Sequence, residues 1–315
     1  MIGIPTLPSA WVGSHVPLNV EQGEISYRLT KKLMEGRTMD LVESYEFIRE
    51  SIVALSIKDV PTSSEGAKPG TFPSTFGTGF IVREDGLIVT NDHVIKAASQ
   101  YRQDFKLPII ATLFKKFPEA FVGMPFEVMG VLALKASPLE DVFEYGPKIP
   151  DIGFMRVHQR GLPAVKLNDN LAVLREGVEV ATAGYPLGNI PFQLNQSIGP
   201  TLQRGIISAV FPFPGTNPHS FAINVMSHGG ASGSPVFLAD SGEVIGILYG
   251  GLNIPSNFTY VIPARYLTAC LSMDLTKVGI NPFTSEIQHF ADTVKDVEQE
   301  LKKGYDNAVQ KAKKK

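Results

Sequence analysis

The spacing of apolar residues divides the chain of 315 residues into three parts. From Glu21 to about Glu50, apolar residues recur mostly every three or four positions, which predicts helix, and Gly36 divides this stretch into two helices. From about residue 51 to 265, short apolar runs alternate with Gly and Pro and predict strands. From about Thr284, one apolar stripe with helical spacing predicts an amphipathic helix.

The central part predicts a mostly β fold, because roughly a dozen short strands follow one another without long helices between them. One of these predicted strands covers residues 86–95. Gly86 and Gly242 lie in predicted hairpin turns, since glycine adopts positive φ without steric cost. Residues 161–176 are predicted to form the connecting segment between two β-rich halves of this central part. The pattern favours a barrel or sandwich over a doubly wound sheet.

The composition is that of a soluble globular protein, with 43% hydrophobic residues, 19% charged residues and a net charge of −2. This charge gives no electrostatic basis for nucleic-acid binding. Cys270 is the single cysteine, so no intrachain disulfide can form, and its apolar neighbours predict a buried thiol. We find neither metal-ligand spacing nor a phosphate-binding loop, so we expect no cofactor and no metal.

The first residues of the chain lack the basic region and the unbroken apolar region of a signal peptide. No window approaches the roughly 18 uncharged apolar residues of a membrane span. We therefore expect a cytoplasmic protein without a membrane span.

The sequence GASGSP at residues 230–235 places a serine among small residues directly before an apolar strand. A nucleophilic serine needs a base, a group that orients the base, and N–H donors for the oxyanion. Gly230 and Ser232 are placed to supply these donors, because a glycine backbone can turn its N–H inward. The lipase-type turn G-x-S-x-G is disfavoured, since its fifth position is Ser234 here and a strand follows instead of a helix.

Several segments occur in the order that one enzyme family uses: GTGFIVREDGLIVTNDHVI, DIGFMRV, GYPLGN, LQRGIISAV, GASGSPVFLADSGEVIGILYGG and TYVIPA. Over about residues 51–268 the chain resembles the trypsin-like serine peptidases, and most of all their HtrA/Deg branch. The resemblance implies two six-stranded antiparallel β-barrels, and the helical patterns on either side of it predict N-terminal and C-terminal helical extensions. Each segment alone is a loose match, whereas the joint match is specific.

The resemblance and the helical patterns that flank it together predict a division of the chain into domains. An N-terminal helical extension covers residues 1–50, the peptidase domain covers residues 51–275, and a C-terminal amphipathic helix covers residues 276–315. Within the peptidase domain, the first barrel spans about 51–160 and the second about 175–270. No segment after residue 270 has the length or strand content of the PDZ domain that is common in this branch, so we expect a relative without one.

Position by position, the resemblance implies a catalytic triad of His93, Asp151 and Ser232, with an oxyanion hole formed by Gly230 and Ser232. His93 would take the proton of Ser232, and Asp151 would fix the histidine tautomer. Two aspartates closer to His93 in sequence, at positions 85 and 92, are weaker candidates for that role. The histidine at position 228 could line the cleft, with a structural or specificity role rather than a role as a second base.

In the family, the residue six positions before the nucleophile lines the primary pocket, and here it is Met226. The strand after the following hairpin contributes Tyr249, Gly250 and Gly251. Because no acid stands at Met226, a buried Lys or Arg of the substrate would be unpaired, so we expect cleavage after small or medium apolar residues. The long stretch 101–126 is expected to form a loop over the cleft.

The leading functional hypothesis is a serine endopeptidase that acts on a protein or peptide substrate through an acyl-enzyme on Ser232. The alternative is a catalytically silent trypsin-like protein that acts as a binding or assembly module. A self-cleaving assembly protein with a narrow target is a third possibility. The apolar stripe of the C-terminal helix must dock on the barrels, which we favour, or pair with another chain, so the terminal helices could form a homo-oligomer.

Overall fold

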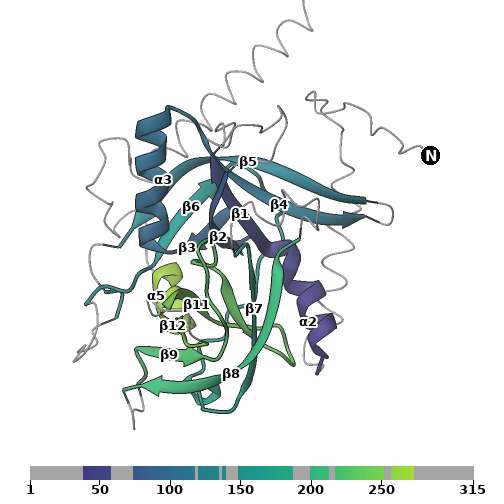
Figure 1. The fold of residues 1–315 in the computed structure, drawn as a ribbon, viewed down its shortest axis with the longest axis vertical. Coiled ribbons are helices and arrows are strands. Elements are labelled where there is room, and N and C mark those ends of the chain that lie inside the picture. Colours follow the sequence, from purple (N-terminus) through teal and green to yellow (C-terminus); the bar gives the residue numbers. More distant parts are fainter. Residues whose placement is uncertain are drawn as a thin grey trace, which may run out of the picture. The chain divides into compact units, whose positions relative to one another are not determined.

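Twelve strands in the described part of the chain close into two six-stranded barrels, which confirms the predicted fold class (Figure 1). Hydrogen-bonded neighbours within each barrel are antiparallel. This computed structural model describes residues 38–57, 74–117, 120–134, 137–139, 148–186, 199–212, 217–251 and 257–272.

Barrel one has the strand order β1-β2-β3-β6-β5-β4, and the pairing of β4 with β1 closes it. Its strands are β1 (Ile52–Ile57), β2 (Ser74–Arg83), β3 (Leu87–Thr90), β4 (Ile109–Phe117), β5 (Ala120–Ala133) and β6 (Gly153–Val157). The turn from β2 to β3 contains Gly86 with φ of 93°, as the hairpin prediction requires.

Barrel two has the order β10-β11-β12-β9-β8-β7, and the pairing of β10 with β7 closes it. The passage between the barrels, after β6, includes the predicted connection at 161–176. The strands are β7 (Glu179–Gly184), β8 (Thr201–Phe211), β9 (Ser220–Ile223), β10 (Pro235–Leu238), β11 (Val244–Gly251) and β12 (Thr259–Pro263). Gly242, with φ of 68°, forms the predicted turn before β11.

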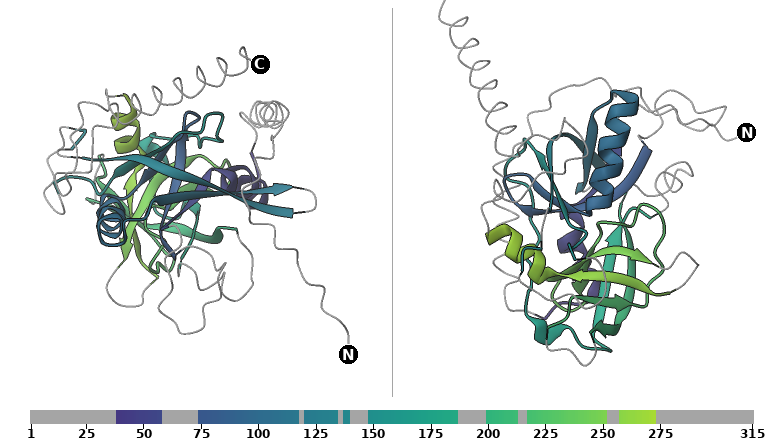
Figure 2. Two further views of the ribbon diagram at one scale, coloured as in Figure 1. Left: turned by 90° about the horizontal axis from the view of Figure 1, so that it is seen from above. Right: turned by 90° about the vertical axis from the view of Figure 1, so that its left-hand side faces the viewer.

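The described helices are α2 (Leu41–Ile48), α3 (Asp92–Phe105) and α5 (Ala264–Ser272), with short 3₁₀ turns at Arg49–Ser51 and Leu171–Val173. A capping box starts α2: Asp40 accepts the N–H of Glu43 at 2.8 Å, and the Glu43 carboxylate accepts the N–H of Asp40 at 3.3 Å. Figure 2 shows α3 beside barrel one and α5 beside barrel two. The buried thiol predicted for Cys270 is confirmed in α5.

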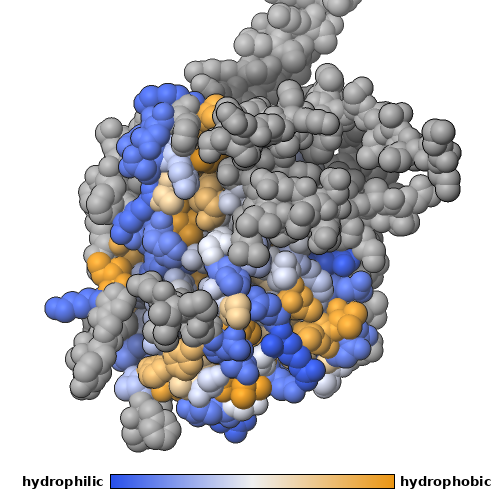
Figure 3. All heavy atoms as spheres, in the orientation of Figure 1, coloured by the Kyte–Doolittle hydropathy of each residue, from blue (hydrophilic) through white to orange (hydrophobic). Residues whose placement is uncertain are grey.

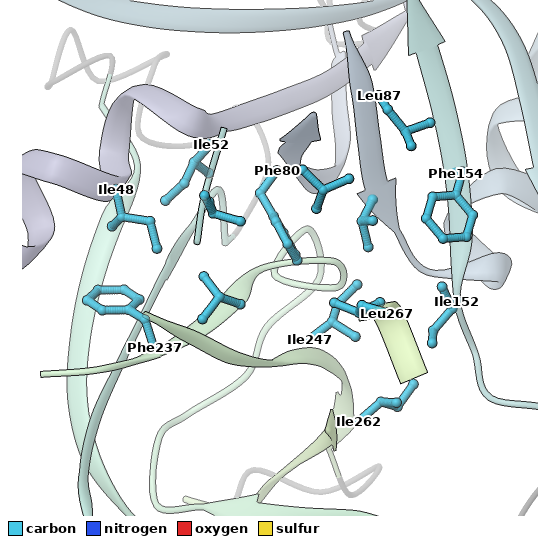
Figure 4. Close-up of a cluster of buried hydrophobic side chains, with 14 of the residues drawn as sticks. Ile48, Ile52, Phe80, Leu87, Ile152, Phe154, Phe237, Ile247, Ile262 and Leu267 are labelled. Carbon is cyan, nitrogen blue, oxygen red and sulfur yellow. The ribbon is translucent and has the colours of Figure 1, made fainter. Parts of the chain in front are cut away.

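Three groups of buried apolar side chains fill the described fold. One group, here called the shared cluster, contains residues of both barrels, of α2 and of α5. A second group lies in barrel one with α3, and a third in barrel two. Figure 4 shows Phe80 of β2 in the shared cluster together with Ile247 of β11 and Leu267 of α5. Burying one such side chain stabilises a fold by about 1.5–3 kcal/mol, so the shared cluster holds the barrels against each other.

The strand β1 explains why the chain shows continuous apolar runs instead of strict alternation. All six of its residues are buried. Ile52 and Ala54 lie in the shared cluster, whereas Val53, Leu55 and Ile57 belong to the group inside barrel one and α3. Successive side chains of a strand point to opposite faces, so a strand that is covered on both sides is apolar throughout.

Two predictions about the region after β3 are wrong. The strand predicted over 86–95 ends at Thr90, and α3 begins at Asp92. Val94, Ile95 and Ala98 recur at helical spacing and are buried against barrel one, so tertiary packing outweighs the local preference of β-branched residues. The stretch 101–126 forms no loop over the cleft, because it contains the end of α3, all of β4 and the start of β5. Figure 1 shows β4 and β5 as one long hairpin.

The polarity of the exposed surface differs between α3 and α2. Figure 3 shows polar side chains over the outer face of α3 and apolar ones near α2, where Val42 is 66% exposed. The first of the two helices predicted between Glu21 and Glu50, the break at Gly36 and the predicted C-terminal helix over 276–315 lie outside the described residues, whereas the second predicted helix is present as α2.

Candidate active site

The pairing of β3 with β6 brings His93 and Asp151 together. Thr90, the last residue of β3, lies opposite Gly153, the first residue of β6. The side-chain amide of the buried Asn91 donates to the carbonyl of Asp151 at 2.8 Å. His93 lies three residues beyond the end of β3, and Asp151 lies two residues before the start of β6. The two predicted site residues therefore meet at the start of α3.

His93 and Asp151 are joined by two hydrogen bonds. Nδ1 of the ring lies 2.6 Å from Oδ2 of Asp151, and the backbone N–H of His93 donates to Oδ1 at 3.0 Å. An ionised carboxylate only accepts, so this contact places a proton on Nδ1 and leaves Nε2 as an acceptor in the neutral ring. The His93 side chain is 47% exposed and that of Asp151 22%, so the ring is open to a substrate while the carboxylate is more protected.

The two other nearby aspartates have different partners, as the sequence led us to expect. Asp92 pairs with Lys96 at 2.6 Å across one turn of α3. Asp85 contacts Arg83 at 2.5 Å and Arg156 at 2.7 Å. Burial opposes ionisation of Asp85, but hydrogen bonds from the two guanidinium groups outweigh it and hold the pKa of Asp85 below its usual value.

The loop at residues 228–234, here called the nucleophile loop, turns sharply around Ser232. Gly230 has φ of 91° and Gly233 has φ of 88°, a region in which glycine is strongly favoured. Within the loop, the N–H of Ala231 donates to the carbonyl of His228 and that of Ser234 to the carbonyl of Ala231, each at 3.0 Å. The N–H of Gly233 donates to Leu248 of β11 at 3.0 Å.

Two further N–H groups of this turn, those of Gly230 and Ser232, flank Ala231. Neither has a hydrogen-bond acceptor among the described residues. Both N–H groups are therefore available to an acceptor from a substrate, as the predicted oxyanion hole requires. Ser232 itself is partly exposed.

Barrel one holds the nucleophile loop through Thr78 of β2. The N–H of Thr78 donates to the carbonyl of Ser232 at 3.0 Å. The carbonyl of Thr78 accepts the hydroxyl of Thr90 at 2.7 Å, and Thr90 lies three residues before His93. Among the described residues no hydrogen bond joins the His93 ring to the Ser232 hydroxyl. Catalytic contacts of this kind commonly tighten only in the substrate complex.

The residues predicted to line the pocket lie in barrel two. Met226 is 40% exposed, and a Cβ added at Gly250 would meet nothing within 4 Å. Tyr249 is partly buried, with its ring 6.0 Å from that of Tyr260. Burial raises the pKa of Tyr249, and a side-chain hydrogen bond with Ser220 opposes this shift. Gly251 ends β11 and pairs with Thr259.

Sequence reasoning missed several residues at this site. Thr78, Thr90 and Asn91 are fully buried and hold the site residues through their side chains. They lie in the same segments that carried the family resemblance, in GTGFIV and in TNDHVI, but their hydrogen bonds link distant parts of the chain. Tyr260 was also missed. Its place beside the pocket follows from the pairing of β12 with β11, opposite Gly250.

His228 is exposed, and only its backbone carbonyl takes part in the nucleophile loop. The described residues contain no group of three or more His, Cys, Asp or Glu side chains that could hold a metal ion. Within the same part of the chain, no helix combines the length and the apolar character of a membrane span.

Two antiparallel barrels, with a histidine–aspartate pair on one and a glycine-flanked serine on the other, define the chymotrypsin-like class of serine peptidase folds. The family profile described as a trypsin-like peptidase domain matches residues 77–247, more than half of the chain. The chain belongs to the trypsin-like peptidase family.

Its relatives are HtrA-type proteins, in agreement with the resemblance read from the sequence. It is 22% identical over 268 residues to "Serine protease HTRA2, mitochondrial" of Drosophila persimilis, covering 82% of this chain and 53% of the relative. It is 28% identical over 178 residues to "Probable periplasmic serine endoprotease DegP-like" of Marinomonas sp. (strain MWYL1), covering 55% of this chain and 29% of the relative. The chain spans about half the length of the first of these curated relatives and less of the second.

The chain is also similar to solved structures, one of which reaches a TM-score of 0.50. The HtrA-type protease AlgW with a decapeptide has a TM-score of 0.50 and 19% identity, covering 74% of this chain and 67% of that chain. The serine endoprotease from Yersinia pestis has a TM-score of 0.47 and 20% identity, covering 74% of this chain and 65% of that chain.

Proposed function

We propose that this chain is a serine endopeptidase that cleaves peptide bonds through an acyl-enzyme on Ser232. The observation that carries the proposal is the pair of hydrogen bonds between His93 and Asp151. A carboxylate that binds both the ring Nδ1 and the backbone N–H of one histidine fixes the ring orientation and its tautomer together. A general base for a serine nucleophile needs this preparation.

The reaction begins when Ser232 Oγ attacks the carbonyl carbon of the scissile bond and its proton passes to Nε2 of His93. The charge of Asp151 stabilises the imidazolium that forms. The N–H groups of Gly230 and Ser232 bind the oxyanion of the tetrahedral intermediate, and one such donor contributes about 10²–10³ in rate. His93 then returns the proton to the leaving amine. A water, activated by His93 in the same way, releases the acid product and restores the Ser232 hydroxyl.

We propose a preference for small or medium apolar residues before the scissile bond. Met226 offers an apolar side chain at the predicted pocket, and no carboxylate stands at that position. The open space beside Gly250 leaves room for a substrate side chain. A substrate Lys or Arg would be desolvated without a partner, which costs several kcal/mol in order of magnitude.

The substrate class follows from the reaction, so the partner is a protein or peptide. The domain limits, with a peptidase domain over 51–275, remain part of the proposal. Assembly through the terminal helices also remains a proposal, because those segments lie outside the described residues. A cytoplasmic location stays a prediction, since the names of two relatives place those proteins in mitochondria and the periplasm.

The test uses a fluorophosphonate probe, which reacts covalently with activated serine hydroxyls. We expect the full chain to be labelled and the Ser232→Ala protein to remain unlabelled. Ser227→Ala is the matched control, because Ser227 lies in the same region and has no proposed role, and it should label like the parent. Absence of labelling in a folded parent protein would support the silent binding module instead. Self-cleavage in trans or in cis would appear as fragments that the Ser232→Ala protein does not produce.

A further inference from the structure

We propose that Thr78 is a positioning residue whose hydroxyl and backbone hold the nucleophile loop in register with the strand that leads to His93. The inference rests on the proposed function, because it assigns Thr78 to the geometry of the same reaction. Thr78 lies in β2 of barrel one, and Ser232 lies in barrel two. The side chain of Thr78 touches neither reacting atom, so its effect acts through the loop.

Thr78 uses each of its polar groups. Its hydroxyl donates to the carbonyl of Gly230 at 2.7 Å and accepts the N–H of Tyr185 at 3.0 Å. Its N–H donates to the carbonyl of Ser232 at 3.0 Å, and its carbonyl accepts the hydroxyl of Thr90 at 2.7 Å. Thr78 is fully buried, so its own polar groups depend on these partners and not on water.

The two bonds from Thr78 to the loop fix two peptide units, one on each side of the Ala231–Ser232 peptide. In the Gly230–Ala231 unit, the carbonyl binds Thr78 and the N–H binds the carbonyl of His228. In the Ser232–Gly233 unit, the carbonyl binds Thr78 and the N–H binds the carbonyl of Leu248. Both units are thus held at both ends, and the free N–H of Ser232 keeps one direction.

This support matters because glycine gives the loop little stiffness of its own. Gly229, Gly230 and Gly233 all lie within five residues, and two of them have positive φ. Without the hydroxyl of Thr78, the Gly230–Ala231 peptide would lose one of its two fixed ends. Displacement of a reacting group by about 1 Å costs on the order of 10² in rate.

Close packing around Thr78 makes valine a suitable probe. A Cβ added at Gly184 would lie 2.9 Å from the Thr78 hydroxyl, so the site has little spare room and valine matches threonine in shape. We expect Thr78→Val to lower kcat by about 10² with little change in KM. Thr78→Ser, which keeps the hydroxyl, should retain kcat within a few-fold. Because the His93–Asp151 pair is untouched, the pH profile of kcat should keep its shape in both proteins.

Thr182→Val is the matched control. Thr182 is also buried, and its hydroxyl donates to the carbonyl of Pro235 at 2.9 Å. Because this control also loses a buried hydroxyl hydrogen bond, it should lower the unfolding free energy while keeping kcat. A Thr78→Val protein with the kcat of the parent would overturn the proposal, and so would a Thr78→Ser protein that loses as much activity as Thr78→Val.

If Thr78→Val does not fold, Thr90→Val supplies the measurement, since it removes the bond that ties Thr78 to the end of β3. We expect about a tenfold lower kcat, and a parent-like kcat would overturn the proposal. The fluorophosphonate probe separates this inference from the proposed function. An unlabelled parent protein would refute the proposed peptidase reaction itself. A labelled parent together with a Thr78→Val protein of equal kcat would refute only the role of Thr78.

Discussion

The replacement Asp151→Asn is the sharpest test of the catalytic geometry, because the two side chains have nearly the same shape and differ in what they donate. Oδ1 of Asp151 accepts the backbone N–H of His93 at 3.0 Å. That donor is fixed, so the carbonyl oxygen of an asparagine must face it. The amide NH₂ must then face Nδ1 of the ring, where Oδ2 now lies at 2.6 Å.

This orientation reverses the tautomer of the ring. An NH₂ group only donates, so Nδ1 becomes the acceptor and the proton of neutral His93 moves to Nε2. Nε2 can then no longer take the proton of Ser232. We expect kcat to fall by about 10⁴, the size of the same replacement in the well-studied triad. At about 1.36 kcal/mol for each factor of ten, this equals roughly 5 kcal/mol of lost transition-state stabilisation.

The assay is steady-state hydrolysis of a fluorogenic peptide with a small apolar residue before the scissile bond, with the rate of fluorophosphonate labelling as a second readout. Asp92→Asn is the matched control, because Asp92 adjoins His93 in sequence and pairs with Lys96 instead. We expect its kcat to stay within about twofold of the parent, as for a surface ion pair. A loss of less than tenfold in Asp151→Asn, or an equal loss in Asp92→Asn, would refute the assignment of Asp151.

Three further predictions concern other parts of the fold. Gly233→Ala should lower the unfolding free energy by several kcal/mol in denaturant melts, because its Cβ would lie 2.0 Å from the carbonyl oxygen of Thr78 and the backbone φ is 88°. Gly229→Ala is the control: its Cβ would meet nothing within 4 Å, so the unfolding free energy should change by less than about 0.5 kcal/mol. Met226→Asp should raise kcat/KM for a substrate with Lys before the scissile bond by about tenfold relative to a substrate with Ala there. If the ratio of these two kcat/KM values does not change, Met226 does not line the pocket. Burial raises the pKa of Cys270 to about 12, above its value of roughly 8.5 in the unfolded chain. The contribution of the neutral thiol to folding stability is therefore complete below pH of about 8.5 and declines as the pH rises toward 12. In this range the parent should lose up to about 1.4 kcal/mol per pH unit more than Cys270→Ala, and parallel curves would contradict the burial of the thiol.

The sequence was sufficient to predict the features that depend on local chemistry. The turns at Gly86 and Gly242 follow from the need for positive φ, and the structure has both. The two barrels followed from a resemblance spread over many short segments, since strand runs alone left barrel and sandwich open. The pairing of His93 with Asp151 was likewise implied by the order of the segments, and the structure supplies the contact.

The features that the sequence did not predict depend on packing between distant segments. A strand was expected through His93 because residues 86–95 form one of the short apolar runs of the central part. The helix forms there because both side chains, with Ala98, pack against barrel one. The hydroxyl of Thr78 could not be assigned for the same reason, since its partners at Gly230 and Tyr185 lie more than a hundred positions away.

The position of Thr78 at the end of the shared cluster shows why a hydroxyl is needed there. Residues 78, 80 and 82 share one face of β2, and Phe80 and Val82 lie in the shared cluster. At position 78 the same face reaches the nucleophile loop, where the carbonyl of Gly230 and the N–H of Tyr185 both point at it. An apolar side chain would remove the hydrogen bond that each group makes with the hydroxyl, at about 0.5–1.5 kcal/mol for each bond. A hydroxyl donates to one and accepts from the other. It therefore ends the apolar contact between the barrels and fixes the loop that carries Ser232.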